Sequence, residues 1–274
     1  MTPSTGPAAA GQVPRPAGPM GPIEASARLL AVWCFTAAFI LPAATFLVLT
    51  LGQLSLRLGA SVARIWGRTV VRLLGIRFEI EGAERLAGRA PRILVFNHSS
   101  TLDLPVVSAL CPDGALAIGK TELRWVPFIG LAWWALGHAF LDRGNPERAR
   151  ASIESIGRRL TRSSRTAMIA PEGTRSPDGR LQPFKMGAFH LARVSGAPIV
   201  PMLIEGAADC LPLGEWRVRP GRVRVRVLEP VPTAGWIEED LRDRAESVRA
   251  IFARHLEPGG SGGDDLPGPP GESR

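Results

Sequence analysis

The stretch RILVFNHSSTLDLP, Arg92 to Pro105, decides how this chain is organised. Residues 92–97 have the continuous apolar character of a strand that is buried on both faces. The segment from Ser100 to Leu110 has the composition of a helix. A strand followed directly by a helix is the building unit of α/β proteins, so we expect a loop with polar side chains between the two.

The same alternation continues along the chain and predicts an α/β domain with a central sheet. RVRVRV (222–227) alternates perfectly, which predicts a half-solvated strand with valine inward and arginine outward. The apolar segment 125–141 is slightly short for a membrane span, and prolines and glycines interrupt it, so we expect buried structure or an interfacial surface. The remaining predicted strands are 116–120, 166–171 and 198–206, and the remaining predicted helices are 146–160, 184–194 and 237–256.

The N-terminal part of the chain predicts a membrane anchor. Residues 1–22 are rich in Pro, Gly and Ala, and we expect them to be disordered. The run from Leu29 to Leu56 carries no charge and exceeds the roughly 20 residues that span a bilayer. It is also too long for a secretory signal, and no small-residue cleavage site follows it. Because Pro42 lies inside the run, a single kinked span and a re-entrant helical pair both remain open.

A basic amphipathic helix is predicted after the apolar run. Arginines recur from Arg57 to Arg77, with apolar residues between them at helical spacing and no acidic residue before Glu79. Such a helix suits an anionic lipid surface, and the positive-inside rule places the following domain in the cytoplasm. We therefore divide the chain into a disordered tail (1–22), anchoring and basic helices (23–78), an α/β domain (79–256) and a second disordered tail (257–274).

The net charge of +8 and the sequence pI near 10.9 predict an anionic partner. Membrane phospholipid and phosphorylated substrates both fit, whereas nucleic acid does not, because no binding module is recognisable beside the anchor. The three cysteines, Cys34, Cys111 and Cys210, have neither metal-ligand spacing nor the pattern of a disulfide framework. We expect no metal site.

His98 and Asp103 are candidates for an acid–base pair. On a regular helix five residues turn the direction by about 140°, so the two side chains meet only if His98 lies in the loop and Asp103 in the first helical turn. Asp103 could then accept a hydrogen bond from His98 Nδ1 and leave Nε2 as a base. The alternative is an ordinary helix start with Ser99 or Ser100 as the N-cap.

The segment PEGTRSPDG, Pro171 to Gly179, follows another predicted strand. Gly173 and Thr174 allow backbone and hydroxyl donors to approach a ligand closely, and Arg175 has a planar fork suited to phosphate. Glu172 is itself acidic, so we expect it to hold Arg175 or to bind a substrate hydroxyl. A tight turn with a surface arginine is the alternative interpretation.

Four blocks in this order, NHSSTLD, GHAFLDR, EGTR and APIVP, resemble the glycerolipid acyltransferase family, which includes the 1-acylglycerol-3-phosphate acyltransferases. The resemblance extends from about Arg92 to Glu229 and includes the connecting segment SPDGRLQPFKMGAFHLA. It implies an acyltransferase-like α/β domain with a central mixed sheet flanked by helices. Two features depart from the family pattern: Ser100-Thr101 stands where many members have an aromatic residue, and His138 is unusual in the second block.

The resemblance also implies an activity and roles for individual residues. His98 would take the proton from the sn-2 hydroxyl of 1-acylglycerol 3-phosphate as that hydroxyl attacks an acyl thioester, and Asp103 would orient the imidazole. Pro201 would shape the acyl or thioester site. Acyl-CoA or acyl-carrier protein would be the co-substrate, with no other cofactor. The implied group around the acceptor phosphate consists of Lys120, Arg143, Glu172, Gly173, Thr174 and Arg175, with Lys185 as a weaker candidate.

Together these features predict a bacterial inner-membrane enzyme whose catalytic domain faces the cytoplasm and forms phosphatidate from lysophosphatidate. Two alternatives remain open. The same chemistry could act on another lysolipid, such as a lyso-ornithine lipid. The chain could also be a membrane lipid-binding module without catalysis, although the intact His98 and Asp103 argue against it.

Overall fold

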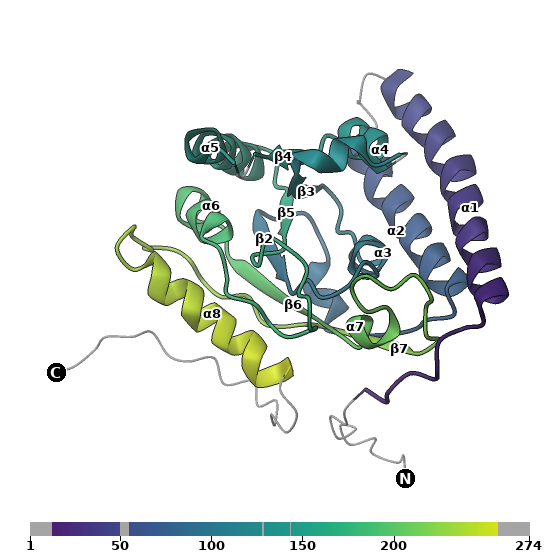
Figure 1. Ribbon diagram of the computed structural model, residues 1–274. Helices are drawn as coiled ribbons and strands as arrows, with labels where there is room; N and C mark the ends of the chain where they lie inside the picture. Colours follow the sequence, from purple (N-terminus) through teal and green to yellow (C-terminus); the bar gives the residue numbers. More distant parts are fainter. Residues whose placement is uncertain (1–12, 50–54, 128, 143, 257–274) are drawn as a thin grey trace, which may run out of the picture.

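The computed structural model describes residues 13–49, 55–127, 129–142 and 144–256 and contains a seven-stranded sheet (Figure 1). Neighbouring strands are parallel except for the antiparallel pair β6–β7, so the predicted mixed sheet is confirmed. In spatial order the strands are β1 (Arg77–Glu81), β7 (Arg222–Val227), β6 (Ile199–Glu205), β2 (Arg92–Phe96), β5 (Thr166–Ile169), β3 (Ala115–Lys120) and β4 (Ala139–Leu141).

Helices cover the sheet on both faces (Figure 1). One layer contains α5 (Pro146–Arg162), α6 (Gly187–Ser195) and α8 (Leu241–Leu256). The other layer contains α1 (Pro22–Leu49), α2 (Ser55–Leu73), α3 (Asp103–Ala109), α4 (Ile129–Ala135) and the short α7 (Ala207–Cys210). Two 3-10 turns, η1 (Ala83–Leu86) and η2 (Thr121–Trp125), complete the described elements.

The alternating side chains of the strands explain the two layers. Leu94 of β2 belongs to the apolar core under α2 and α3, whereas Ile93 and Val95 belong to the core under α5, α6 and α8. A strand with both faces buried has to be apolar throughout, which is what the sequence of β2 shows. In β7 the valines are buried and the arginines are partly exposed, as the alternation predicted.

The described part of the predicted membrane segment up to Leu49 belongs to one long helix, α1, which contains Pro42 and packs beside α2. Trp66 Nε1 of α2 donates a hydrogen bond to Thr36 Oγ1 of α1 at 3.1 Å, and Arg28 donates to the carbonyl of Leu73 at 3.0 Å. Among the described residues, α1 is the one helix that is long and apolar enough to cross a membrane. Only 17% of its most apolar window is buried, so α1 turns most of its apolar surface away from the protein.

Part of the N-terminal tail is ordered, contrary to the expectation for residues 1–22. The Ala17 and Met20 N–H groups donate to the carbonyls of Pro220 and Val218 at 3.3 and 3.1 Å, and Met20 is buried. The apolar side chain of Met20 packs into a core whose other residues are distant in the sequence. The predictions for residues 1–12, 50–54 and 257–274 lie outside the described residues.

The structure also differs from the predicted elements in detail. The helix expected from Ser100 begins at Asp103, because the intervening residues form the loop that surrounds the Asp103 carboxylate. The edge strands β1 and β4 were not predicted. Each is short and is defined as a strand by its pairing with a neighbouring strand, β7 or β3. The apolar segment 125–141 contributes the end of η2, then α4 and β4.

Candidate active site

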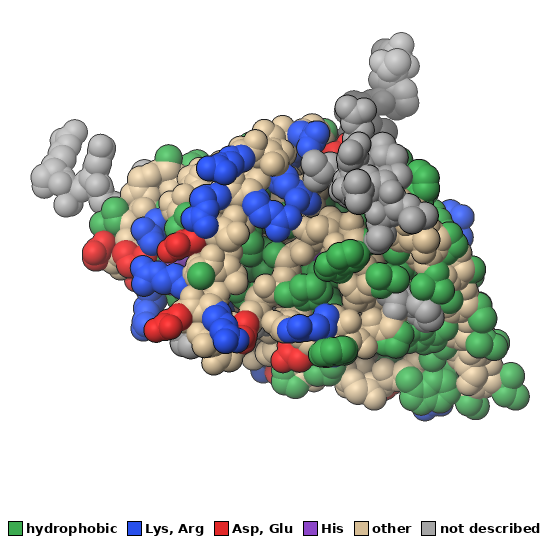
Figure 2. Space-filling model, turned by 90° about the horizontal axis from the view of Figure 1, so that it is seen from above, with side chains coloured by type: hydrophobic (Ala, Val, Ile, Leu, Met, Phe, Trp, Pro, Cys, Tyr) green, Lys and Arg blue, Asp and Glu red, His purple; other side chains and the backbone are tan. Residues whose placement is uncertain are grey.

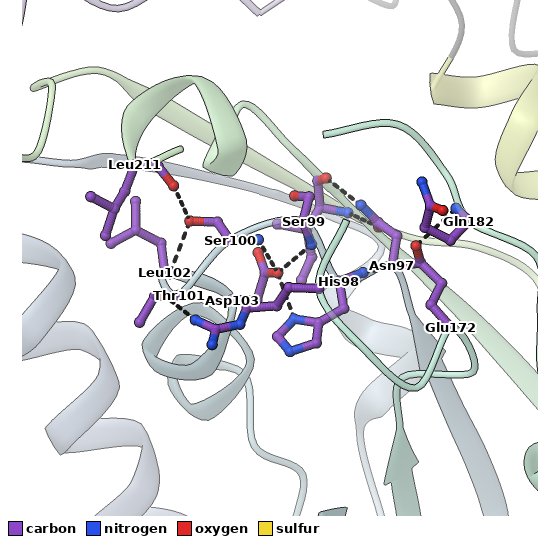
Figure 3. A network of polar contacts seen from close by, with 12 residues as sticks. Asn97, His98, Ser99, Ser100, Thr101, Leu102, Asp103, Glu172, Gln182 and Leu211 are labelled. Atoms are coloured by element: carbon purple, nitrogen blue, oxygen red, sulfur yellow. Dashed lines mark hydrogen bonds and ion pairs between the residues drawn. The ribbon is translucent and has the colours of Figure 1, made fainter. Parts of the chain in front are cut away.

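The site forms where two neighbouring parallel strands end. Val95 of β2 is in register with Ile169 of β5, and their loops leave the same edge of the sheet. His98 and Glu172 each follow three residues after those positions, so the two loops start level with each other. Ligands of α/β proteins bind at this carboxyl edge, and Figure 3 shows how the polar side chains of the two loops meet there.

The predicted contact between His98 and Asp103 is present. His98 Nδ1 and Asp103 Oδ2 are 2.8 Å apart, and the same oxygen accepts the N–H groups of Ser99 and Ser100 at 2.7 and 2.8 Å (Figure 3). An ionised Asp103 requires the hydrogen on Nδ1, which leaves the lone pair on Nε2. The His98 side chain is 27% exposed, so this nitrogen can meet a substrate.

The Asp103 carboxylate is fully buried, and no arginine or lysine among the described residues pairs with it. Its second oxygen, Oδ1, is buried without a hydrogen-bond partner among the described residues. A negative charge that is buried without a cationic partner stabilises a positive charge that develops beside it. Asp103 is therefore positioned to stabilise an imidazolium formed at His98 during a reaction.

Glu172 binds the backbone of the loop that carries His98, called the histidine loop. Its exposed fraction is 2%, Oε1 accepts the backbone N–H of His98 at 2.6 Å, and Oε2 accepts that of Gln182 at 2.9 Å. Burial raises the pKa of Glu172 to about 7. Among the described residues Glu172 forms no ion pair with Arg175, because both of its carboxylate oxygens accept backbone N–H groups inside the protein.

Arg175 connects the two loops on the exposed side. Its Nη1 donates a hydrogen bond to the Thr101 hydroxyl of the histidine loop, and both Thr174 and Arg175 are exposed. Gly173 has a φ of 74°, a left-handed conformation that glycine adopts without steric cost. Among the described residues no carboxylate pairs with Arg175, so its guanidinium can receive an anion close to His98.

The other predicted site residues lie further from the pair. Lys120 is exposed at the end of β3, at the same edge of the sheet. Pro201 is buried in β6 beside Val95, one layer below the loop, and its carbonyl accepts the Leu228 N–H at 2.9 Å. Lys185 is exposed behind the Glu172 loop. Arg143 lies outside the described residues.

Sequence reasoning did not predict the contacts by which three residues fix the loop. Asn97 exchanges two hydrogen bonds with the backbone of Ile204 in β6, at 2.9 and 2.8 Å. The Ser100 hydroxyl donates to the Leu211 carbonyl at 2.7 Å, and Thr101 accepts from Arg175. The only signal in the sequence is that polar residues follow a buried strand directly, because their partners lie 74 to 111 residues away.

Two other kinds of reactive side chain have no acid–base or nucleophilic character here. Burial lowers the pKa of His138 to about 3, and its Nδ1 accepts the Ala117 N–H at 3.3 Å, so it is a neutral structural residue. Burial raises the pKa of Cys111 to about 12 and that of Cys210 to about 11, which keeps both as thiols. In the described part of the chain no group of His, Cys, Asp and Glu is arranged to hold a metal ion.

Comparison with known proteins finds acyltransferases. A family model described as Acyltransferase matches residues 77–205. A 1-acyl-sn-glycerol-3-phosphate acyltransferase of Limnanthes alba is 36% identical over 81% of this chain and 80% of its own length. A 1-acyl-sn-glycerol-3-phosphate acyltransferase alpha of Mus musculus is 39% identical over 74% of this chain and 73% of its own length. A 1-acyl-sn-glycerol-3-phosphate acyltransferase of Haemophilus influenzae is 32% identical over 71% of this chain and 80% of its own length.

A solved structure has the same architecture. The crystal structure of the 1-acyl-sn-glycerophosphate (LPA) acyltransferase PlsC from Thermotoga maritima matches with a TM-score of 0.68 and 25% sequence identity. The match covers 84% of this chain and 96% of that protein. The similarity therefore extends well beyond the loops that carry His98 and Arg175.

Proposed function

Because the chain belongs to the acyltransferase family, we propose that it transfers an acyl group to the sn-2 hydroxyl of 1-acylglycerol 3-phosphate and so forms phosphatidate. The acyl donor is acyl-CoA or acyl-carrier protein. The observation that carries the proposal is the hydrogen bond between His98 and the buried Asp103, with Arg175 beside it. The names of the relatives supply the acceptor.

In the proposed mechanism His98 Nε2 takes the proton from the acceptor hydroxyl while the hydroxyl oxygen attacks the thioester carbonyl. Asp103 keeps Nδ1 protonated and stabilises the imidazolium. The tetrahedral intermediate then expels the thiolate, which recovers the proton from His98. A thiolate is a good leaving group, so one base and correct positioning carry the reaction without a covalent enzyme intermediate or a cofactor.

The acceptor phosphate binds at the exposed side of the Glu172 loop in this proposal. Arg175 exchanges its neutral partner, the Thr101 hydroxyl, for a charged oxygen, and charge-assisted hydrogen bonds are the stronger ones. Gly173 and Thr174 lie next to Arg175 in the turn, and Lys120 ends a strand at the same edge. Arg143 completes the proposed group by its place in the second family block.

We further place the protein at the cytoplasmic side of a membrane, the inner membrane of a bacterium. The largely exposed apolar surface of α1 supports this location, as does the basic helix α2 beside it. A lysolipid resides in the bilayer and the thioester donor is soluble, so an enzyme for both has to work at the interface.

The test is transfer of labelled acyl groups from acyl-CoA and from acyl-carrier protein to a panel of lysolipids, including a lyso-ornithine lipid. Wild type, His98→Ala and the control His255→Ala are compared in purified membranes, because His255 lies at the end of α8, away from the loops. We expect phosphatidate from the wild type and the control, and a loss of about 10²- to 10⁴-fold in His98→Ala. A product formed from another lysolipid would change the acceptor, and near-normal rates in His98→Ala would contradict the general-base role.

A further inference from the structure

Among the described residues, eleven of the sixteen exposed large apolar side chains lie on α1, α2 and the segment from η2 to α4. Seven of them belong to α1 and α2, and four belong to η2, to α4 and to Val126 in the segment between η2 and α4. In contrast, α5 and α8 expose none among their described residues. Figure 2 shows hydrophobic side chains gathered on the side where α1 lies and basic side chains gathered towards the opposite side.

The helix α4 has no polar face. Its sequence, IGLAWWA, contains no charge, and Ile129 and Ala132 pack against the core shared with α1 and α2. Leu131 and Trp134 on the other side are 41% and 63% exposed. A helix that is apolar all round is normally buried or in contact with lipid, and α4 is buried on one side only.

The preceding turn enlarges the same surface. Trp125 is 79% exposed, Val126 is 38% exposed, and the guanidinium of Arg124 lies over the Trp125 ring at 5.7 Å from its centre. Tryptophan and arginine side by side are typical of residues at the level of lipid headgroups, where a ring contacts the acyl region and a cation contacts phosphate.

A groove of about 920 Å³ runs between this segment and α5. Arg124, Leu131, Trp134, Phe140 and Arg148 contribute to its walls, so it combines apolar rings with two guanidinium groups. Arg148 is largely exposed, and its ion pair with Asp142 is long, at 3.7 Å. The combination suits an amphiphile with an anionic headgroup.

We propose that η2–α4 is a second membrane-contact surface, continuous with α1, whose tryptophans enter an anionic bilayer while Arg124 and Arg148 bind lipid phosphate groups. The inference rests on the membrane location given under the proposed function. Since η2 begins where β3 ends, at the edge of the sheet that carries the His98 loop, this contact holds the active-site edge against the headgroups. A lysolipid then reaches His98 without leaving the interface.

The test is quenching of tryptophan fluorescence in the full-length protein by bromine on lipid acyl chains. Vesicles contain equal amounts of phosphatidylcholine and phosphatidylglycerol, with or without bromine. Subtracting the signal of Trp134→Phe or Trp125→Phe from that of the wild type isolates each tryptophan. Trp236→Phe is the matched control, because Trp236 also has an arginine over its ring, Arg244 at 5.9 Å, but packs in the opposite layer.

We expect the Trp134 and Trp125 signals to lose at least about half of their intensity in brominated vesicles and the Trp236 signal to stay constant. A protein that sediments with the vesicles while Trp134 and Trp125 remain unquenched would overturn the inference and leave α1 as the anchor. Unquenched tryptophans whose emission shifts with an acidic acyl-carrier protein would assign the surface to a protein partner instead. Failure to bind vesicles, with acyl transfer retained in detergent, would refute both membrane statements but not the chemistry.

Discussion

Carboxylates serve opposite purposes at two places in this molecule. At the active site, Asp103 and Glu172 are almost fully buried and accept hydrogen bonds from the His98 ring and from backbone N–H groups. On the outer strands, Glu79 accepts from Arg222 at 2.6 Å and from Arg224 at 3.3 Å, in partial contact with solvent. The two buried carboxylates form no ion pair with an arginine or lysine of the described residues and fix the geometry of the His98 loop, whereas Glu79 neutralises arginines.

Arginines show the same contrast. Arg222, Arg224 and Arg226 of β7 each pair with a glutamate of a neighbouring strand. Arg175 pairs with a hydroxyl, and no carboxylate among the described residues approaches it. A cation without a counter-ion at a carboxyl edge of the sheet is available to a phosphate, and the paired arginines of β7 are not.

The largest difference between the two places is expected when one carboxylate at each place is replaced by an amide. We expect Asp103→Asn to lower kcat by about 10²- to 10⁴-fold, because the amide no longer holds the tautomer with Nε2 free or stabilises the imidazolium. Glu79→Gln should leave kcat within about twofold, since the outer strands do not touch the reacting groups. Initial rates with saturating lysophosphatidate and acyl-CoA measure both. Equal effects of the two substitutions would contradict the division of roles.

The next largest effect concerns the pH dependence of stability. The pKa of Glu172 is about 7 in the folded protein, above its ordinary value of 4.5. Its contribution to stability is therefore complete below pH 4.5 and lost as the pH rises through 7, by up to about 3 kcal/mol.

The variant Glu172→Gln cannot titrate, although it leaves one backbone N–H without an acceptor at a cost of about 1–3 kcal/mol. We expect the free energy of unfolding of the wild type to fall, relative to that of the variant, between mildly acidic and mildly alkaline pH. Urea unfolding in detergent, followed by tryptophan fluorescence, measures this difference. An identical pH dependence in both proteins would show that Glu172 does not titrate in this range.

A smaller effect sharpens the comparison of the arginines. Arg175→Ala should raise KM for lysophosphatidate by about 10- to 100-fold, the loss of a charged hydrogen bond, and change KM for acyl-CoA by less than about twofold. Thr101→Val is the control, because it removes only the neutral partner that Arg175 uses within the protein. If both KM values rose together in Arg175→Ala, Arg175 would not be a phosphate ligand.

The smallest effect is expected on the outer strands. Glu79→Gln removes the partner of Arg222 and Arg224 at a partly exposed site, so we expect a loss of less than about 1 kcal/mol in the free energy of unfolding, reduced further by added salt. Urea titrations at low and high salt measure it. A loss several times larger would mean that these pairs are part of the core of the fold.

Local patterns in the sequence were sufficient for several of these features. The continuous apolar run of β2, the alternation in β7 and the apolar length of α1 each follow from neighbouring residues. The contact between His98 and Asp103 was also predictable, because only five residues separate them and a strand–loop–helix turn leaves few ways to place them. The mixed sheet was expected from strand–helix alternation and the family resemblance.

The partners of Glu172 and Arg175 could not be predicted in this way. Glu172 was expected beside Arg175, its neighbour in the turn, but it binds the N–H of His98, 74 residues away. Arg175 likewise reaches Thr101 across 74 residues. These contacts exist because β2 and β5 are adjacent in the sheet, an order that no single segment encodes.

The sequence by itself therefore predicted candidate residues for the chemistry and a helix long and apolar enough to span a membrane, since periodicity and short spacings depend on chain neighbours alone. Only the tertiary structure decided which loops face each other, which carboxylate is buried under His98, and that α4 is left with one apolar face uncovered. Strand order and helix packing depend on the burial of apolar surface summed over the whole domain, and that sum becomes visible only when distant segments are in contact.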